Sequence, residues 1–309
     1  MAFILSYIVY SFRSLSSIFM SAAATTNTMA TNCTAIRHLD VPLPPVIHKT
    51  LSKEFMDTFA EVVVIGDVHG CYDELLELLD KIKDDKKDGN NSSEEYNNNK
   101  RILKLFVGDL VNKGPKSAEV LTYLMSNPLD CQSVRGNHDE VVINEFLRYE
   151  TDGEQALKPK NKWISQLSRP QVDYLLEMPY TISIPSLNAL VVHAGIVPGL
   201  DLHRQTLKDM VVMRNLYLDN EENQQQLVAT NSDKTGDKWI SRWSGPEHIY
   251  FGHDAKRGLQ RAQLATGLDT GCVYGNSLTA LFIAGHRTGT FVSVKARAVH
   301  VQPKIKSDL

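Results

Sequence analysis

The stretch Glu61-Val62-Val63-Val64-Ile65-Gly66-Asp67-Val68-His69-Gly70 contains an abrupt change of pattern that decides the fold. Its first five residues are mostly β-branched and predict a buried strand. The Gly-Asp and His-Gly pairs that follow predict a loop, and the leucines at 75, 76, 78 and 79 predict an amphipathic helix after it. A strand, a polar loop and a helix in succession are typical of an α/β domain.

The same order of elements recurs twice. A strand over 102–107 runs into the sequence GDLVNKGP (108–115) and then a helix from about 117 to 125. A short strand near 131–134 runs into RGNHD (135–139) and then a helix through Phe146. Three such units imply parallel strands with right-handed crossovers, and ligands of such sheets gather beyond the carboxyl ends of the strands.

The rest of the chain predicts a helical insertion at 150–178 and then a second sheet. The expected strands lie near 180–184, 190–193, 249–252, 278–283 and 290–294. Polar composition predicts loops at 84–100 and 223–237. We therefore expect an α/β sandwich of two mixed β-sheets flanked by helices. The expected parts are a leader at 1–39, a linker at 40–60, the domain at 61–302 and a tail at 303–309.

The leader has no acidic residue, is rich in Ser and Thr, and carries Arg13 and Arg37 as its strong cations. This composition favours a mitochondrial transit peptide, with a secretory signal or a disordered cytosolic leader as alternatives. The apolar run Met1–Tyr10 is about half of the ~20 residues that span a bilayer, so no transmembrane segment is expected. We predict a mitochondrial or cytoplasmic location.

The bulk composition narrows the choice of partners. A net charge of -3 over 309 residues provides no general attraction for nucleic acid, so no stable nucleic-acid complex is expected. An anionic substrate must then be held by a local cationic site. The four cysteines form no CxxC pair, and Cys71 and Cys272 are interpreted as small buried residues. The oligomeric state is not indicated.

Six side chains beside the predicted strand ends are of the types that bind divalent metal ions. They are Asp67, His69, Asp109, Asn137, His193 and His253. Carboxylate, imidazole and amide oxygen ligands suit ions of the Mn, Fe or Zn type. Two ions ~3.5–4 Å apart need one shared carboxylate, and Asp109 is our choice of bridge. A hydroxide bound by both metals would then attack phosphorus without a protein nucleophile.

Further residues near these loops suit the remaining roles. His138 follows the proposed ligand Asn137 and is our candidate for the general acid that protonates the leaving group. Arg135 and Lys113 are candidates for holding the non-reacting phosphate oxygens. Three more arginines are weaker candidates for substrate binding, against ordinary surface ion pairs: Arg214, Arg242 and Arg257.

The motifs GDVHG (66–70), GDLVNKGP (108–115), RGNHD (135–139), VVHAG (191–195) and FGHD (251–254) resemble those of the metal-dependent phosphoprotein-phosphatase, or calcineurin-like metallophosphoesterase, superfamily. GHDAKRGLQ (252–260) and LDTGCVYGNSLTAL (268–281) suggest its ApaH-like branch. The resemblance implies two divalent ions, Mn first with Fe, Zn and Co as alternatives. It implies Asp67 and His69 on one ion, Asp109 bridging, and Asn137, His193 and His253 on the other.

The chain departs from the protein-phosphatase pattern at positions that bear on the substrate. That pattern has Asp and Arg where this chain has Asn112 and Lys113, and Glu where it has Asp139. The branch implies a hydrolase of phosphoanhydride or phosphoester bonds. Its candidate substrates, in order, are dinucleoside polyphosphates, polyphosphate, a capped RNA end and phosphoprotein, with a non-catalytic metal-dependent binding module as the alternative of another class.

Overall fold

The computed structural model describes residues 36–84, 101–219 and 226–303. Most of the predicted leader, the polar loop at 85–100 and most of the tail lie outside these ranges, so their predictions stay predictions. Within the described ranges, no helix combines the length and the apolar character that a membrane crossing requires.

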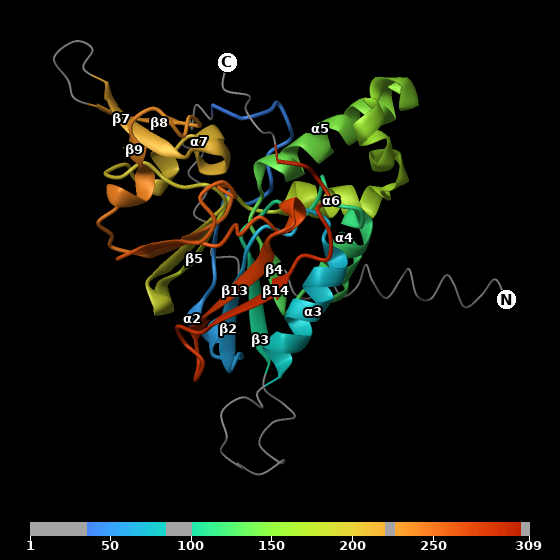
Figure 1. Ribbon diagram of the computed structural model, residues 1–309. Coiled ribbons are helices and arrows are strands. Elements are labelled where there is room, and N and C mark those ends of the chain that lie inside the picture. The colour runs from blue at the N-terminus through green and yellow to red at the C-terminus, as the bar shows by residue number, and fades with distance from the viewer. Residues whose placement is uncertain (1–35, 85–100, 220–225, 304–309) are drawn as a thin grey trace. The chain divides into compact units, whose positions relative to one another are not determined.

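The predicted βα units form a five-stranded mixed sheet (Figure 1). In spatial order its strands are β14 (Phe291–Lys295), β13 (Ser277–Ala284), β2 (Glu61–Ile65), β3 (Ile102–Phe106) and β4 (Cys131–Ser133). β2, β3 and β4 pair in parallel, as the repeated units predict, whereas β13 pairs antiparallel with β2. The carboxyl ends of the three parallel strands therefore share one edge of the sheet.

The second predicted sheet is six-stranded and also mixed. In spatial order its strands are β1 (His48–Thr50), β5 (Thr181–Ile184), β6 (Ala189–Val192), β10 (His248–Phe251), β12 (Ala265–Gly267) and β11 (Gln260–Ala262). β6 pairs in parallel with β10, so the residues that follow both strands emerge at the same edge. Two mixed sheets confirm the predicted fold class.

Alternation of side chains along the strands defines the layers. Val62 and Val64 of β2 pack in a cluster with Val191 of β6, which fills the space between the two large sheets. Val63 and Ile65 point the other way, into a cluster with the helices. Because successive residues of a strand face opposite sides, a strand buried on both faces reads as the continuous apolar run seen in the sequence.

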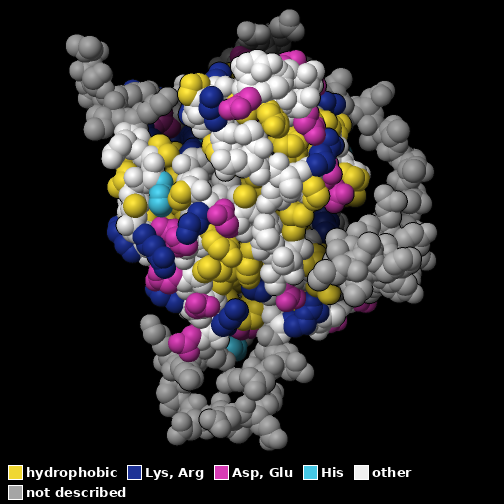
Figure 2. All heavy atoms as spheres, turned by 90° about the vertical axis from the view of Figure 1, so that its right-hand side faces the viewer, with side chains coloured by type: hydrophobic (Ala, Val, Ile, Leu, Met, Phe, Trp, Pro, Cys, Tyr) yellow, Lys and Arg dark blue, Asp and Glu magenta, His cyan; other side chains and the backbone are white. Residues whose placement is uncertain are grey.

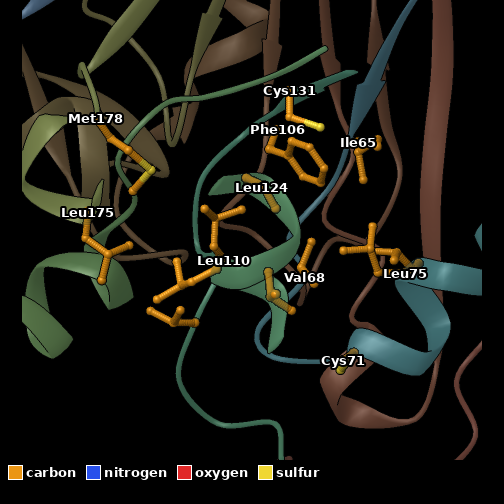
Figure 3. Packing of buried hydrophobic residues seen from close by; sticks show 14 of the residues in the cluster. Ile65, Val68, Cys71, Leu75, Phe106, Leu110, Leu124, Cys131, Leu175 and Met178 are labelled. Carbon is orange, nitrogen blue, oxygen red and sulfur yellow. The ribbon is translucent and has the colours of Figure 1, made fainter. Parts of the chain in front are cut away.

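Helices cover the outer face of the five-stranded sheet. The α-helices are α2 (Lys53–Met56), α3 (Tyr72–Lys83), α4 (Ser117–Ser126), α5 (Asn137–Asp152), α6 (Arg169–Glu177) and α7 (Leu207–Val212). Short 3-10 helices are η2 (Glu154–Ala156), η3 (Pro159–Gln166), η4 (Pro185–Leu187), η5 (Leu202–Arg204), η7 (Trp239–Ser241) and η8 (Cys272–Tyr274). Figure 3 shows Leu75 of α3, Leu124 of α4 and Leu175 of α6 in one cluster with Ile65 and Phe106 of the sheet.

A third sheet was not predicted. It is antiparallel, with β7 (Asn215–Asp219) between β8 (Gln226–Thr230) and β9 (Asp237–Lys238). The predicted loop at 223–237 is therefore wrong over β8. β8 has no fully buried residue, so its sequence lacks the apolar run that marks a core strand.

The predicted linker at 40–60 also contains regular structure. β1 pairs in parallel with β5 at the edge of the six-stranded sheet, and Ser52 caps α2 by accepting from the Phe55 N–H. The residues just before the predicted linker contact the domain as well, since the Lys208 N–H donates to the Ile36 carbonyl. This segment is thus part of the packed domain in the described structure, although sequence composition groups residues 36–39 with the leader.

Candidate metal centre

The six predicted metal ligands follow the carboxyl ends of five strands from both large sheets. The loop after β2 carries Asp67 and His69, the loop after β3 carries Asp109, α5 begins with Asn137 after β4, His193 follows β6, and His253 follows β10. Ligand atoms of Asp67, Asp109 and His193 all lie within 4.8 Å of one another. The structure therefore brings together residues that are up to 186 positions apart in sequence, since the His253 N–H donates to the Asp67 carboxylate.

Left-handed backbone conformation is concentrated in these loops. The non-glycine residues with positive φ there are His69 (46°), Asp109 (50°), Asn112 (74°), Lys113 (72°) and His253 (69°). In the part of the chain that the structure describes, only Asn188 is added to this group. Such residues are strained, and strain of this kind clusters at functional sites, where the surroundings fix the side chains.

Two glycines leave room for the carboxylates. A Cβ added at Gly136 would collide with Oδ1 of Asp109, and one added at Gly252 would collide with Oδ1 of Asp67. Each glycine immediately precedes a predicted ligand, Asn137 or His253. The Gly-Asn and Gly-His pairs in the sequence therefore reflect the close approach of a carboxylate to the backbone.

Each ligand histidine is oriented by a backbone carbonyl. Nδ1 of His69 lies 3.2 Å from the Val111 carbonyl, Nδ1 of His193 lies 2.8 Å from that of Val107, and Nε2 of His253 lies 3.1 Å from that of Val212. Burial lowers the pKa of all three rings and so favours their neutral form, in which the nitrogen facing the carbonyl donates. The other nitrogen keeps its lone pair, as a metal ligand requires.

These lone pairs converge. Oδ1 of Asn137 lies 2.9 Å from Nδ1 of His253 and 3.0 Å from Nε2 of His193. The Asp109 carboxylate lies between two histidines, with Oδ2 3.3 Å from Nε2 of His69 and Oδ1 3.4 Å from Nε2 of His193. Acceptor atoms this close repel each other unless a cation lies among them, so the donor set fits metal ions.

The charges of the site point the same way. Burial, then Asp269 and Asp109, raise the pKa of Asp67 well above its ordinary value. Burial also opposes ionisation of Asp109, but His193 and the other neighbouring imidazoles, with Lys113, outweigh it and lower the pKa of that carboxyl. Adjacent buried carboxylates are costly unless positive charge offsets them, and divalent ions would supply that charge.

His138, Asn112 and Lys113 lie beside the ligands. Nδ2 of Asn112 is 3.1 Å from Nδ1 of His138, and the Asn112 Oδ1 accepts from the Lys113 N–H. With the amide in this orientation, Nδ2 donates to the imidazole. Burial lowers the pKa of His138 to about 4. The Lys113 ammonium donates to Nε2 of His69 at 3.0 Å and lies 5.3 Å from the ring centre of Tyr274.

Asp139 has a role that sequence reasoning missed. Its carboxylate is fully buried and accepts from the backbone N–H groups of Asp109, Leu110 and Gly136 at 2.8–2.9 Å. It therefore ties the loop after β3 to the loop after β4. The Asp-Leu-Val and Gly-Asn-His-Asp stretches gave no signal of this link, because a buried carboxylate and a solvated one look alike in sequence.

The basic candidates have different surroundings. Arg135 is fully buried, and its guanidinium donates to the carbonyls of Pro42 and Leu176. Its predicted phosphate-binding role stays a prediction, and the two contacts fix the backbone segments around Pro42 and Leu176. Arg242 pairs with Asp237 on the surface, as the alternative of an ordinary ion pair anticipated.

Arg214 and Arg257 share one buried carboxylate, Asp254. Nε of Arg214 lies 3.5 Å from Oδ1 of Asp254, and an Arg257 terminal nitrogen lies 2.7 Å from its Oδ2. Arg214 also donates to the His253 carbonyl at 3.4 Å. Both arginines therefore brace the loop of His253. They remain candidates for substrate contact only through the guanidinium nitrogens that do not contact Asp254.

His38 is a second residue that sequence reasoning missed. Ile36, two residues earlier, is held by Lys208 of α7, and Pro42, four residues later, is held by Arg135. His38 thus lies on a segment that runs from α7 to Arg135, which lies two positions after the end of β4 of the five-stranded sheet. Burial and then Lys208 lower the pKa of this half-buried ring, while Asp109 raises it. Nothing in the sequence indicated its position, because the composition of residues 1–39 groups it with the leader.

Fold and site together define a metal-dependent phosphoesterase. Residues 60–286 match the sequence profile of the calcineurin-like phosphoesterases, and the chain belongs to this family. It is a hydrolase of phosphate bonds that uses divalent metal ions. The resemblance expected from the motifs is thereby confirmed.

Individual relatives make the comparison more specific. The asymmetrical bis(5'-nucleosyl)-tetraphosphatase PrpE of Halalkalibacterium halodurans is 29% identical over 79% of this chain and 97% of its own length. The zinc-dependent endopolyphosphatase of Saccharomyces cerevisiae is 25% identical over 78% of this chain and 81% of its own. A crystal structure provisionally assigned to a diadenosine tetraphosphatase has a TM-score of 0.65 and 32% identity, covering 81% of this chain and 98% of that one.

Proposed function

We propose that this enzyme hydrolyses phosphoanhydride bonds of dinucleoside polyphosphates, with inorganic polyphosphate as the second candidate. The names of the relatives support both substrates: dinucleoside tetraphosphates for one group and polyphosphate for the yeast protein. Manganese is our first choice of metal, with iron, zinc and cobalt as alternatives. When bound, the ions supply an activated water and neutralise phosphate oxygens.

We assign the ligands to two ions around Asp109. Oδ2 of Asp109 faces His69, and Oδ1 faces His193 on the opposite side, which is the placement a bridging carboxylate needs. Asp67 and His69 would complete one ion's ligands. Asn137 and His253 would join His193 at the other, because Oδ1 of Asn137 lies near both ring nitrogens.

The contact between Asn112 and His138 carries the choice of substrate. A strong general acid is an imidazolium with both nitrogens protonated, and a carboxylate accepting from Nδ1 would favour it. Here an amide nitrogen donates to Nδ1 of His138, which disfavours that form. A weak acid suffices when the leaving group is a phosphate, whose second pKa is near 6, but not when it is a serine alkoxide.

Lys113 supports the same substrate class. Its ammonium lies against His69 and close to the Tyr274 ring, so it offers a positive charge at the rim of the ligand group. A lysine holds phosphate as a point charge and lacks the bidentate fork of arginine. We infer that it contacts a phosphate next to the one that reacts, which a polyphosphate chain always provides.

The face of the molecule in Figure 2 gives no reason to rank a long nucleic acid higher. Figure 2 shows one face of the molecule, on which basic and acidic side chains are intermixed without a broad basic area. A capped RNA end stays third and a phosphoprotein fourth among the candidates. All six predicted ligand residues are present, which argues against a non-catalytic binding module.

A substrate panel tests the proposal. The full chain loaded with Mn²⁺ is given diadenosine tetraphosphate, polyphosphate, capped RNA and a phosphoserine peptide under the same conditions, with Asp109→Asn as the inactive control. We expect the dinucleotide to be turned over fastest and the peptide slowest. Preferred turnover of the peptide would contradict the substrate assignment, and full activity of Asp109→Asn would contradict the metal centre.

The double variant Asn112→Asp/Lys113→Arg sharpens the assignment. It restores the residues of the protein-phosphatase pattern, so the introduced carboxylate would accept from His138 and favour the protonated form of that ring. We expect the ratio of peptide to dinucleotide turnover to rise at least about tenfold, which is a fraction of the roughly 10²–10⁴-fold that general-acid catalysis contributes in full. An unchanged ratio would show that these two residues do not select the substrate.

A further inference from the structure

A second group of ligand-type side chains lies outside the proposed metal centre. One ligand atom each from Cys71, Glu74 and His300 lie within 4.8 Å of one another. Cys272 lies in the same buried cluster as Cys71, and the neighbouring Cys71 thiol raises the pKa of Cys272. Cys71, Cys272 and Glu74 are buried, and His300 is half-buried. None of the four has a part in the proposed phosphoester chemistry.

Three separate segments bring these side chains together. Cys71 precedes α3 and Glu74 lies in its first turn, as Figure 3 shows for Cys71. Cys272 opens η8, which follows the six-stranded sheet. His300 belongs to the C-terminal segment, whose backbone is fixed on η8 because its N–H donates to the Val273 carbonyl at 3.1 Å.

The spacing between Glu74 and His300 suits two ligands of a small tetrahedral ion. Oε1 of Glu74 lies 3.5 Å from Nε2 of His300. Ligands at the usual zinc distances of roughly 2.0–2.3 Å are separated by about 3.3–3.8 Å in a tetrahedron. The same Glu74 oxygen accepts from the Arg297 N–H at 2.9 Å, and this contact fixes the orientation of the carboxylate.

The chemistry of this set differs from that of the Asp109 centre. The Asp109 centre offers oxygen and imidazole ligands only, whereas this group adds two sulfur ligands. Thiolates select soft or borderline ions such as zinc over manganese or magnesium. Buried thiols alone are ordinary small core residues, but a buried carboxylate and an imidazole directed at them are not expected in an apolar cluster.

We propose that Cys71, Cys272, Glu74 and His300 bind a structural zinc ion. Binding releases the two thiol protons to solvent, and the resulting thiolates coordinate the ion with no change in oxidation state. The ion joins the C-terminal segment and η8 to the start of α3. Because Cys71 is two residues from His69, the clamp also supports the first ligand loop of the catalytic centre.

Cobalt substitution tests this proposal with a readout that is independent of activity. Co²⁺ bound to thiolates gives intense charge-transfer absorption in the near ultraviolet, and the Asp109 centre has no sulfur ligand. Metal-free full-length protein is titrated with Co²⁺, and zinc content is measured in protein purified with zinc. We expect the thiolate band to saturate at one Co²⁺ per chain and to be displaced by Zn²⁺.

Matched variants assign the site. Cys71→Ser and Cys272→Ser should each weaken the band and lower the zinc content by one ion per chain, and Cys131→Ser should change neither. Cys131 is a suitable control because it is also a buried free thiol, and it lies in β4. His300→Ala is the variant to use if loss of a buried thiol prevents folding, since this ring is half-buried.

Several results would overturn the zinc site. They are the absence of a thiolate band in the wild type, equal zinc content in wild type and Cys71→Ser, or equal loss in Cys131→Ser. A Cys71–Cys272 disulfide found by mass spectrometry in protein purified under reducing conditions, without bound zinc, would also overturn it. None of these results bears on hydrolysis at Asp109, so this proposal and the proposed function fail separately.

Discussion

The two large sheets hold their ligand loops by different kinds of brace. Beside the five-stranded sheet, the buried Asp139 carboxylate accepts from backbone N–H groups of two loops, and no ion pair joins it to a cation within the described ranges of the chain. Beside the six-stranded sheet, the buried Asp254 carboxylate is paired with Arg214 and Arg257. The first brace fixes the backbone itself, and the second acts through long side chains. Loss of the first should therefore be more damaging.

The largest effect is expected for Asp139→Asn. The amide nitrogen would replace an acceptor that faces buried backbone N–H groups, leaving at least one unsatisfied at a cost of about 1–3 kcal/mol. We expect the free energy of unfolding to fall by about 2–4 kcal/mol and turnover to fall at least tenfold. Denaturant unfolding and steady-state kinetics would measure both. Asp152→Asn, at an exposed position of the same helix, is the control. Equal behaviour of the two variants would contradict the brace.

A smaller and more selective effect is expected for Asp254→Asn. The arginines can reorient toward solvent, so stability should change less than in Asp139→Asn. Metal affinity should nevertheless fall by roughly 10–100-fold, because the loop of His253 loses its support. Titration of metal-free protein with Mn²⁺, followed by activity, measures this. Asp237→Asn, which affects only the exposed pair with Arg242, should bind metal normally. A larger loss of stability than in Asp139→Asn would reverse the comparison.

His38 lies on the segment that links the two regions. If its ring contacts substrate over the ligands, His38→Ala should raise KM several-fold, while metal affinity and unfolding stay nearly unchanged. Asp40→Ala is a matched control, because this carboxylate is exposed on the same segment. Steady-state kinetics with diadenosine tetraphosphate makes the comparison. An unchanged KM in His38→Ala, or the same increase in Asp40→Ala, would show that the segment only packs there.

The smallest effect is expected for Arg242→Ala. The pair with Asp237 is exposed, and such pairs contribute about 0–1 kcal/mol. Turnover, KM and the midpoint of thermal unfolding should all stay close to those of the wild type. A tenfold rise in KM would instead place Arg242 at the substrate and revive the sequence hypothesis.

The sequence predicted the parts of the fold in which each element carries its own signal. β2 is buried on both faces and α3 has one apolar stripe, so both could be recognised locally. β8 and β1 could not, because a partly exposed strand gains its stability from pairing with a neighbour that the local sequence does not reveal. The third sheet and the structured linker were missed for this reason.

The clustering of the six candidate ligands was predictable for a related reason. Hard-metal ligands at the ends of parallel strands need no long-range information beyond strand order, and the motifs at His69, Asp109 and Asn137 supplied it. The roles of Arg135 and Asp139 depended on what lies across the fold. Arg135 meets the Pro42 carbonyl 93 residues away, and Asp139 meets the loop after β3, contacts that side-chain type alone does not reveal.

The central claim is that Asp109 bridges two catalytic ions, and anomalous diffraction from crystals grown with Mn²⁺ tests it most directly. We predict two manganese peaks on opposite sides of the Asp109 carboxylate, about 3.5–4 Å apart. One peak should lie beside Asp67 and His69, and the other beside Asn137, His193 and His253. A single peak, or two peaks that Asp109 does not join, would contradict the account.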